Sequence, residues 1–392
     1  MVGQFYSREF IEEIQSNFKV NDHHFIIINY KNKILNLDPE KYQNVKSFTF
    51  SSRGLNGFFT KNDIKIRRLM KKAEYIFIHY LTKEMSRLLF KFRGKAKLVW
   101  IIWGADLYEY IPLKLYDHYT SEILDYKETS ILRKIYYFFN QEIRKSVIKR
   151  LDYIISAHKG DIRLFKKFFR TKAECFYESI YPNPIDFEKL DKKVDFADEK
   201  YNFNKDGGKL LLLGNSGTPS NNHLDVMIRL SKMKKKSFKI ICPLSYGAPN
   251  YIQKIIKNGK ILFGDRFIAL LEFLDPNIYY HILKQIDIAI MYHNRQQGMG
   301  NIQILSYLGK PICMKKTSVY FNLVDRGAVV FSTQDLEKLI LDEVEFTKVM
   351  SINNKKIAAQ YFSVKSARSS IENLFNRLED KNTKLGYEGK RI

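Results

Sequence analysis

Short apolar runs alternate with longer amphipathic segments along the first half of the chain. The runs have four or five residues, are rich in β-branched and aromatic side chains, and end in polar residues, so they predict buried strands. They are 25–29, 75–79, 98–102 and 153–156. This alternation predicts a parallel sheet between helices. A predicted helix, 9–18, precedes the first run, so we expect either that the usual opening strand is absent or that the sheet is rearranged.

A second series of the same kind follows residue 208. Its predicted strands are 209–213, 238–242, 286–291 and 311–314. The segment between the two series has two prolines, many charges and a terminal Gly-Gly, which predicts a linker. We therefore expect α/β architecture with two Rossmann-like domains, whose sheets face each other across a ligand-binding cleft. The expected parts are domains 1–181 and 209–365, a linker 182–208 and a helical tail 366–392.

The excess of positive charge suggests that the protein binds an anionic partner. The 392 residues carry a formal net charge of +24. Lys and Arg outnumber Asp and Glu by 13 to 3 over residues 51–100 and by 10 to 3 over 142–172. The predicted helix 129–150 mixes aromatic and basic residues. It can lie on an anionic membrane surface, or it can pack on the core with a solvated basic face, and the sequence leaves both open.

The cysteines and termini indicate the compartment. There are three cysteines without metal-ligand spacing, which favours a reducing environment and no disulfide framework. No D-x-D motif or His/Cys/carboxylate cluster occurs, so we expect no metal and no cofactor. We see neither a signal-peptide pattern nor an apolar run long enough to span a bilayer. We expect a cytosolic protein whose membrane contact is peripheral.

The segment 210–223, LLLLGNSGTPSNNH, is the strongest local motif. A predicted strand leads into a glycine-containing loop, and a helix is predicted to begin near Asn221 or Asn222. Backbone amides after a strand, together with a helix N-terminus, suit a phosphate group. The alternative is an ordinary turn between strand and helix. The candidate ligand-binding residues are Gly214, Asn215, Ser216, Gly217, Asn222 and His223.

A second glycine-containing loop follows the predicted strand 286–291. Arg295 is the only fully charged residue of the loop 293–301, and it could bind a diphosphate. Two glutamines beside it could contact a sugar or a base, although a plain surface loop is the alternative. Asn301 is the expected N-cap of the next helix. The candidate residues are Arg295, Gln296, Gln297, Gly298, Gly300 and Asn301.

The segment 100–110, WIIWGADLYEY, contains both tryptophans of the chain. Asp106 and Glu109 are three residues apart, so on a short helix they would share a face. A desolvated carboxylate there could act as a general base, while an N-cap role for Asp106 is the alternative. His79 ends another predicted strand and is a third candidate base. Candidate acceptor-binding residues at these strand ends are Trp103, Gly104, His158 and Asp161.

Together these segments resemble a known family. Residues 103–109 (WGADLYE), the GNSG loop with Asn222-His223, and the block RQQG-x-G at 295–300 are similar to the bacterial TDP-N-acetylfucosamine:lipid II N-acetylfucosaminyltransferase, or 4-alpha-L-fucosyltransferase, family. The blocks occur in that family's order over about residues 20–330. His79 and the Gly160-Asp161 pair also fall at family positions. We expect the opening strand of the family's N-terminal domain to be absent from this chain, and both ends of the chain match the family poorly.

The resemblance implies a GT-B glycosyltransferase. Its implied donor is a dTDP-linked 4-acetamido-4,6-dideoxyhexose, and its implied acceptor is a polyprenyl-diphosphate-linked saccharide, as in enterobacterial common antigen assembly at the cytoplasmic face of the inner membrane. The C-terminal domain would bind the donor and the N-terminal domain the acceptor. The alternatives are a UDP- or GDP-sugar donor, a membrane-associated scaffold, or a nucleic-acid-binding protein. We expect no nucleic acid, because no such motif occurs.

Overall fold

The computed structural model describes residues 4–19, 22–30, 42, 44–50, 61–124, 131–181, 199–203, 208–234 and 237–388. The chain forms two compact units. Unit 1 comprises Met1–Tyr110, Thr129–Pro184 and Val364–Ile392, and unit 2 comprises Ile111–Glu128 and Ile185–Ser363. Two boundaries therefore differ from those expected, because the excursion 111–128 belongs to unit 2 and the C-terminal helix to unit 1. Most of the expected linker 182–208 lies outside the described residues.

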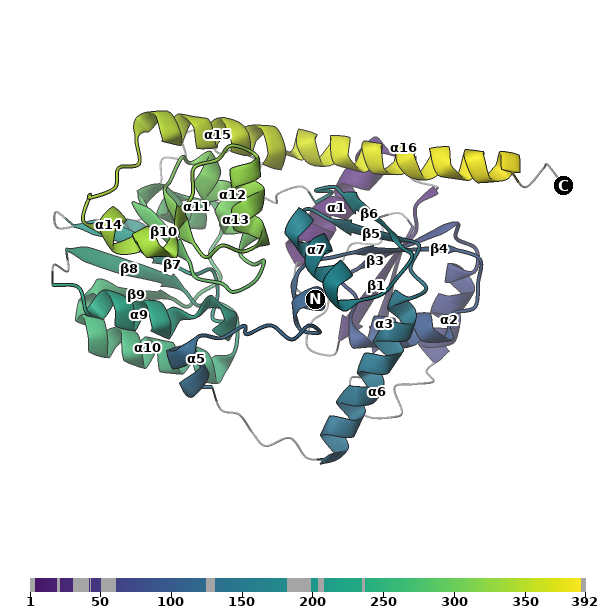
Figure 1. Cartoon of the computed structure of the whole chain (residues 1–392), viewed down its shortest axis with the longest axis horizontal. Coiled ribbons are helices and arrows are strands. Elements are labelled where there is room, and N and C mark those ends of the chain that lie inside the picture. Colours follow the sequence, from purple (N-terminus) through teal and green to yellow (C-terminus); the bar gives the residue numbers. More distant parts are fainter. Residues whose placement is uncertain are drawn as a thin grey trace. The chain divides into compact units, whose positions relative to one another are not determined.

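Unit 1 is built on a four-stranded parallel sheet (Figure 1). Its strands lie in chain order: β3 (Tyr75–His79), β4 (Lys97–Ile101), β5 (Tyr153–Ser156) and β6 (Glu174–Tyr177). A separate parallel pair consists of β1 (Phe25–Tyr30) and β2 (Val45–Phe50). The four strands predicted in this half are confirmed. The sequence did not predict β2 and β6, whose residues mix polar with apolar types.

Helices of unit 1 bury the apolar residues of its sheet. The C-terminal helix α16 belongs here because Ile371 and Leu374 pack with Val99 and Ile155 in one core cluster. The Tyr75 hydroxyl donates to the Leu378 carbonyl at 3.0 Å. The helices of this unit are α1 (Gln4–Asn17), α2 (Lys61–Met70), α3 (Lys83–Lys91), α4 (Ala105–Tyr108), α6 (Ile131–Ile148), α7 (Lys159–Phe168) and α16 (Val364–Glu388).

Unit 2 contains a six-stranded parallel sheet in the order β12-β11-β10-β7-β8-β9. From β7 the chain adds strands on one side and then crosses to the other side of β7, so the order reverses between β7 and β10. In open α/β sheets, ligands bind beyond the strand ends at such a reversal. The strands are β7 (Lys209–Leu213), β8 (Phe238–Pro243), β9 (Phe267–Leu270), β10 (Ile288–Met291), β11 (Ile312–Met314) and β12 (Phe331–Ser332).

Helices pack against both faces of the second sheet and bury two apolar clusters. The α-helices are α5 (His118–Glu122), α9 (His223–Ser231), α10 (Pro249–Phe263), α11 (Pro276–Gln285), α12 (Met299–Tyr307), α13 (Ser318–Asp325), α14 (Leu336–Ile340) and α15 (Lys348–Phe362). The four strands predicted in this half are confirmed, whereas β9 and β12 were not predicted. Across the described residues, no helix is long and apolar enough to cross a bilayer.

Candidate functional site

The two glycine-containing loops of unit 2 meet at the reversal of its strand order. The first loop follows β7 and the second follows β10, which is the neighbour of β7 in the sheet. Gly214 donates its backbone N–H to the Ile290 carbonyl at 2.9 Å, so the two strand ends are in register. The structure therefore brings together two segments that are about eighty residues apart in the sequence.

The side chain of Asn221 holds the backbone of the first loop by hydrogen bonds. Its amide nitrogen donates to the carbonyls of Ser216 at 2.9 Å and Thr218 at 3.0 Å, and its amide oxygen accepts from the Asn215 N–H at 2.9 Å. Gly214 has φ +72°, and a Cβ there would lie 2.6 Å from the Asn221 Oδ1. The glycine is therefore required both by its backbone conformation and by the close approach of Asn221.

Side chains of the second loop hold the first one. Gln297 donates to the Asn215 Oδ1 at 3.1 Å and to the Thr218 hydroxyl at 3.0 Å, and it accepts from the Ser220 hydroxyl at 2.6 Å. The His293 Nε2 lies 2.8 Å from the Asn221 Oδ1. These contacts join side chains of the two loops, and Asn221 in turn bonds the backbone of the first loop.

A small pocket opens beside these loops. Arg295 is the only permanently charged residue in its lining, and its guanidinium also lies 3.4 Å from the Ser220 hydroxyl. Gly298, with φ +71°, is the N-cap of α12, so the helix begins at Met299 and Asn301 is not the N-cap. Instead, the Asn301 amide donates to the Tyr279 hydroxyl at 2.8 Å. The pocket is lined by Met291, His293, Arg295, Gln297, Ile302, Met314, Thr317 and Val319.

Two features of the second loop and the helix after it favour an anion. The first N–H groups of α12, at Met299, Gly300 and Asn301, have no acceptor within their own helix, and the helix dipole adds to their partial charge. With Arg295 they form an arrangement that favours an anionic ligand. His293 adds no charge near neutral pH, because its burial, and then the neighbouring Arg295, hold its pKa well below 6.5.

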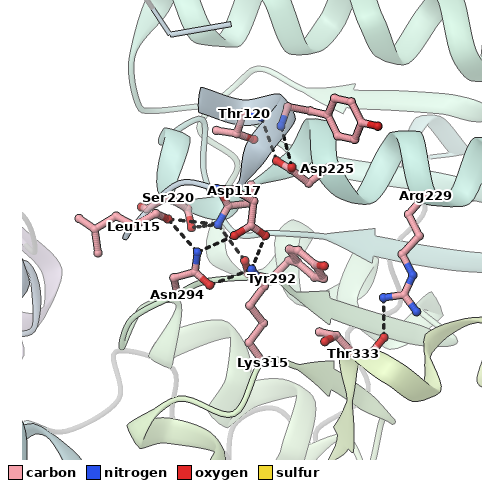
Figure 2. Close-up of polar contacts among 12 residues, drawn as sticks. Leu115, Asp117, Thr120, Ser220, Asp225, Arg229, Tyr292, Asn294, Lys315 and Thr333 are labelled. Carbon is pink, nitrogen blue, oxygen red and sulfur yellow. Dashed lines mark hydrogen bonds and ion pairs between the residues drawn. The ribbon is translucent and has the colours of Figure 1, made fainter. Parts of the chain in front are cut away.

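The excursion from 111 to 124 is tied to the second loop by a polar cluster (Figure 2). Asp117 forms an ion pair with Lys315 and accepts from the Asn294 amide at 2.8 Å. The Lys315 ammonium also donates to the Asn294 Oδ1 at 2.8 Å. Asp225 accepts the first N–H groups of α5, those of Tyr119 and Thr120, at 2.9 and 3.0 Å.

Asn222 and His223 are not placed as ligand-binding side chains. Both are fully buried. Asn222 accepts from the Asp117 N–H at 2.8 Å and donates to the Tyr292 carbonyl at 3.1 Å, so it anchors the excursion. His223 contacts the Tyr251 hydroxyl at 3.1 Å, and burial lowers its pKa to about 3. Both side chains therefore have structural contacts in unit 2.

In unit 1, Asp106 is also fully buried. Its carboxylate accepts from the Leu81 N–H at 3.0 Å, the Trp100 Nε1 at 2.8 Å and the Trp103 N–H at 2.9 Å. Burial raises its pKa, while the Arg144 guanidinium opposes that shift. With three donors and no exposed surface, this carboxylate fixes the strand end and cannot reach a substrate in this structure.

Glu109 does not share the environment of Asp106. It is the C-cap of α4 and is exposed, so the expectation that the two carboxylates lie on one face is wrong. The helix is only four residues long, which is too short to repeat a face. Of the two carboxylates, only that of Glu109 is accessible to a substrate.

His79 belongs to an aromatic chain of contacts. The Trp103 Nε1 donates to the Tyr181 hydroxyl at 2.6 Å, and that hydroxyl in turn contacts the His79 Nδ1. Burial lowers the pKa of His79 to about 4, so the ring is neutral near pH 7. When Tyr181 donates its proton to Nδ1, the other ring nitrogen carries the histidine proton and is not a base.

The remaining acceptor-side candidates have structural contacts. Gly104, with φ +102°, is the N-cap of α4, and His158 is the N-cap of α7 and is 3% exposed. Asp161 is buried and accepts from the Tyr108 hydroxyl at 2.7 Å. These residues shape the strand ends. Trp103 is half-buried and is the acceptor-side candidate with the largest apolar face still partly accessible.

Sequence reasoning overlooked several residues of the unit 2 site. Thr218, Ser220 and Asn221 lie within the quoted motif, but a hydroxyl or amide beside a glycine gives no sign that it will bond a loop from another strand. Lys315 and Asp117 are far apart in sequence and carry no local pattern. In the described part of the chain, no group of three or more His, Cys, Asp or Glu is placed to hold a metal ion.

Comparisons with known proteins agree with this fold. A family model described as 4-alpha-L-fucosyltransferase, glycosyl transferase group 56, matches residues 2–374. Anabaena Alr3699/HepE in complex with UDP superposes with a TM-score of 0.66 at 13% identity, covering 96% of both chains. A Rickettsia africae glycosyltransferase gives 0.61 at 14% identity, again covering 96% of both chains. Sucrose-phosphate synthase of Thermosynechococcus elongatus gives 0.62 at 10% identity, covering 96% of this chain and 93% of that one. The fold is GT-B.

Proposed function

We propose a specific reaction for this chain, which belongs to the 4-alpha-L-fucosyltransferase family and is a nucleotide-sugar-dependent glycosyltransferase. In this reaction it transfers a 4-acetamido-4,6-dideoxyhexose from a dTDP donor to a polyprenyl-diphosphate-linked saccharide. The reaction would take place at the cytoplasmic face of a membrane, and we expect it to be metal-independent. The observation that carries the donor half is the small pocket of unit 2, whose lining includes Arg295 and Ile302 of the first turn of α12.

In this proposal the acceptor hydroxyl attacks the anomeric carbon of the sugar. The bond from that carbon to the diphosphate oxygen breaks, and dTDP leaves with the electron pair. Arg295 and the N–H groups of Met299 and Gly300 stabilise the charge that develops on the diphosphate. Asn215 and Gln297, already paired with each other, would contact the sugar or base.

We assign the general base to Glu109. Its carboxylate is exposed, whereas that of Asp106 is buried with three donors, and His79 is held by Tyr181. Glu109 would accept the proton of the acceptor hydroxyl, and Trp103 would pack against the acceptor saccharide.

A second candidate is the same transfer from a UDP-sugar. It is favoured by the structural similarity to Alr3699/HepE, which was crystallised with UDP and with UDP-glucose. Thermal-shift titration with dTDP, UDP, GDP and ADP tests both, because a ligand bound only by the folded protein raises its apparent stability. Selective stabilisation by dTDP supports the proposed donor, and selective stabilisation by UDP replaces it. No response from a folded sample contradicts both.

A further inference from the structure

Exposed apolar side chains are concentrated on one helix of unit 1. Seventeen large hydrophobic residues are exposed in the described part of the chain, and five of them lie within nine residues of α6. Phe138 and Phe139 are 62% and 61% exposed, and Ile131 is 75% exposed. Single exposed apolar residues are common, but a cluster of this density on a helix marks an interaction site.

Four of these residues form one face of α6. Ile131, Ile135, Phe138 and Phe139 have the spacing i, i+4, i+7 and i+8, which places them along one side of the helix. The opposite side carries Asn140, Arg144 and Val147, which are buried. The Asn140 Oδ1 accepts from the Arg87 Nε of α3 at 2.9 Å, and α3 packs along α6 (Figure 1). The four-residue face, which we call the α6 apolar face, therefore points away from the body of unit 1.

Exposed cations accompany the α6 apolar face. On the same helix Lys134 and Lys145 are exposed, and Lys149 follows directly after its end, with Glu142 the acidic residue among them. The neighbouring helices α2 and α3 are joined by the Lys91–Asp63 ion pair of 3.9 Å. They and the residues just after α2 add five exposed cations: Lys65, Arg68, Lys71, Lys72 and Lys83.

This combination selects an anionic lipid surface over other occupants. Aromatic and aliphatic side chains on one helical face enter the boundary between headgroups and acyl chains, while lysines beside them bind anionic headgroups. A second copy of the chain would bring an equally basic surface against this one, and like charges oppose that pairing. A nucleic acid would match the lysines, but it would leave the two phenylalanines without an apolar environment.

We propose that the α6 apolar face inserts into the interface of an anionic bilayer and holds unit 1 at the membrane. The inference deepens the proposed function, since a polyprenyl-diphosphate acceptor is anchored in such a bilayer, but it is drawn from the exposure and charge of α6. Phe138 and Phe139 supply the apolar insertion, and Lys134, Lys145 and Lys149 bind headgroup phosphates.

The test is co-sedimentation of the full chain with vesicles. Wild type is expected to bind vesicles of phosphatidylglycerol and phosphatidylcholine in equal parts, and to bind phosphatidylcholine alone much more weakly. The double variant Phe138→Ser, Phe139→Ser should weaken vesicle binding by at least about tenfold, because it loses the free energy of transferring two aromatic side chains from water into the bilayer interface. Phe273→Ser is the matched control, because Phe273 is 65% exposed but lies in unit 2, and its binding should equal that of wild type.

A fluorescence measurement locates the insertion. In Phe138→Trp, emission should shift to the blue on anionic vesicles, beyond any change seen with the native Trp100 and Trp103. Equal vesicle binding by wild type and the double variant, no blue shift, or a wild-type dimer that the double variant abolishes would each overturn the proposal. Stabilisation by dTDP is measured on the same samples. A double variant that loses vesicle binding but is still stabilised by dTDP would show that membrane binding and donor binding are independent, so the two proposals can fail separately.

Discussion

Both units place polar residues beyond their parallel strands, but they use them differently. In unit 1 the strands follow chain order from β3 to β6, and the groups at their ends bond one another, with Asp106 accepting from Trp100 and Trp103. In unit 2 the order reverses between β7 and β10, and the side chains there hold loop backbone around a pocket. A buried carboxylate at a strand end therefore does not by itself mark a reactive site. The reversal of strand order in unit 2 is the better guide to a ligand site.

The largest expected effect tests which carboxylate of unit 1 reacts. Glu109→Gln should lower kcat by about a thousandfold with little change in KM, because proton transfer to a positioned base is lost. Glu74→Gln, which removes another exposed carboxylate of unit 1, is the control and should keep wild-type kcat. If Glu109→Gln turns over normally, the base must be sought elsewhere.

Arg295→Ala tests the anion site of unit 2. We expect kcat to fall by about a hundredfold, because charge on the departing diphosphate loses its strongest neighbour. The thermal stabilisation by dTDP should also shrink. Arg266→Ala, directly before β9, removes an arginine from the same unit outside the pocket and should leave both quantities unchanged. Wild-type turnover by a folded Arg295→Ala variant would remove Arg295 from the mechanism.

The sequence predicted the strands better than the site. The eight strands predicted from apolar runs are confirmed, because short runs of β-branched and aromatic residues are typical of buried strands. Arg295, which the sequence singled out as the only full charge of its loop, lines the pocket of unit 2, and its role in binding stays a prediction. Asp106 was overrated because a sequence does not show that Leu81, Trp100 and Trp103 all direct donors at it. Asp117 and Lys315 form an ion pair although they are 198 positions apart in the sequence, so no local sequence pattern predicts their contact.

Acid should destabilise both units through neutral buried histidines. The folded pKa is about 3 for His223 in unit 2 and about 4 for His79 in unit 1, against 6.5 for a free side chain. Their contribution to stability is therefore complete above pH 6.5 and is lost as the pH falls below it, because only the unfolded chain then binds the proton. Between pH 7 and pH 5 each should cost about 2 kcal/mol.

Urea unfolding at the two pH values checks this prediction and separates the units. Both tryptophans lie in unit 1, so tryptophan fluorescence follows that unit while circular dichroism follows the whole chain. His293 adds a loss of the same sign in unit 2. Unfolding midpoints that do not change from pH 7 to pH 5 would contradict the burial of these rings.

Asp106→Asn tests the structural role of the buried carboxylate. The amide would direct an NH₂ group at one of the three donors that the carboxylate accepts, so the unfolding free energy should fall by about 2 kcal/mol. An N-cap alone would tolerate Asn. The tryptophan-detected transition of unit 1 should therefore move, whereas kcat of the folded fraction should stay within a few-fold of wild type. A stable but inactive variant would restore Asp106 as the base.

The smallest effect concerns the backbone of unit 2 rather than any charge. Gly298 has φ +71°, and a Cβ there would lie 3.2 Å from the His293 ring and 3.4 Å from Asn215, between the two loops. Gly298→Ala should cost about 1 kcal/mol through its left-handed conformation. It should also weaken dTDP binding, because the first turn of α12 must shift.

Gly327→Ala is the control, because it shares the positive φ, at +84°, but the nearest contact of its added Cβ is 3.8 Å away at Ile357. Both variants should therefore lose similar stability, while only Gly298→Ala loses nucleotide affinity. Equal dTDP binding by the two would mean that the α12 N-terminus does not contact the nucleotide, and the difference between the units would then rest on Arg295 alone.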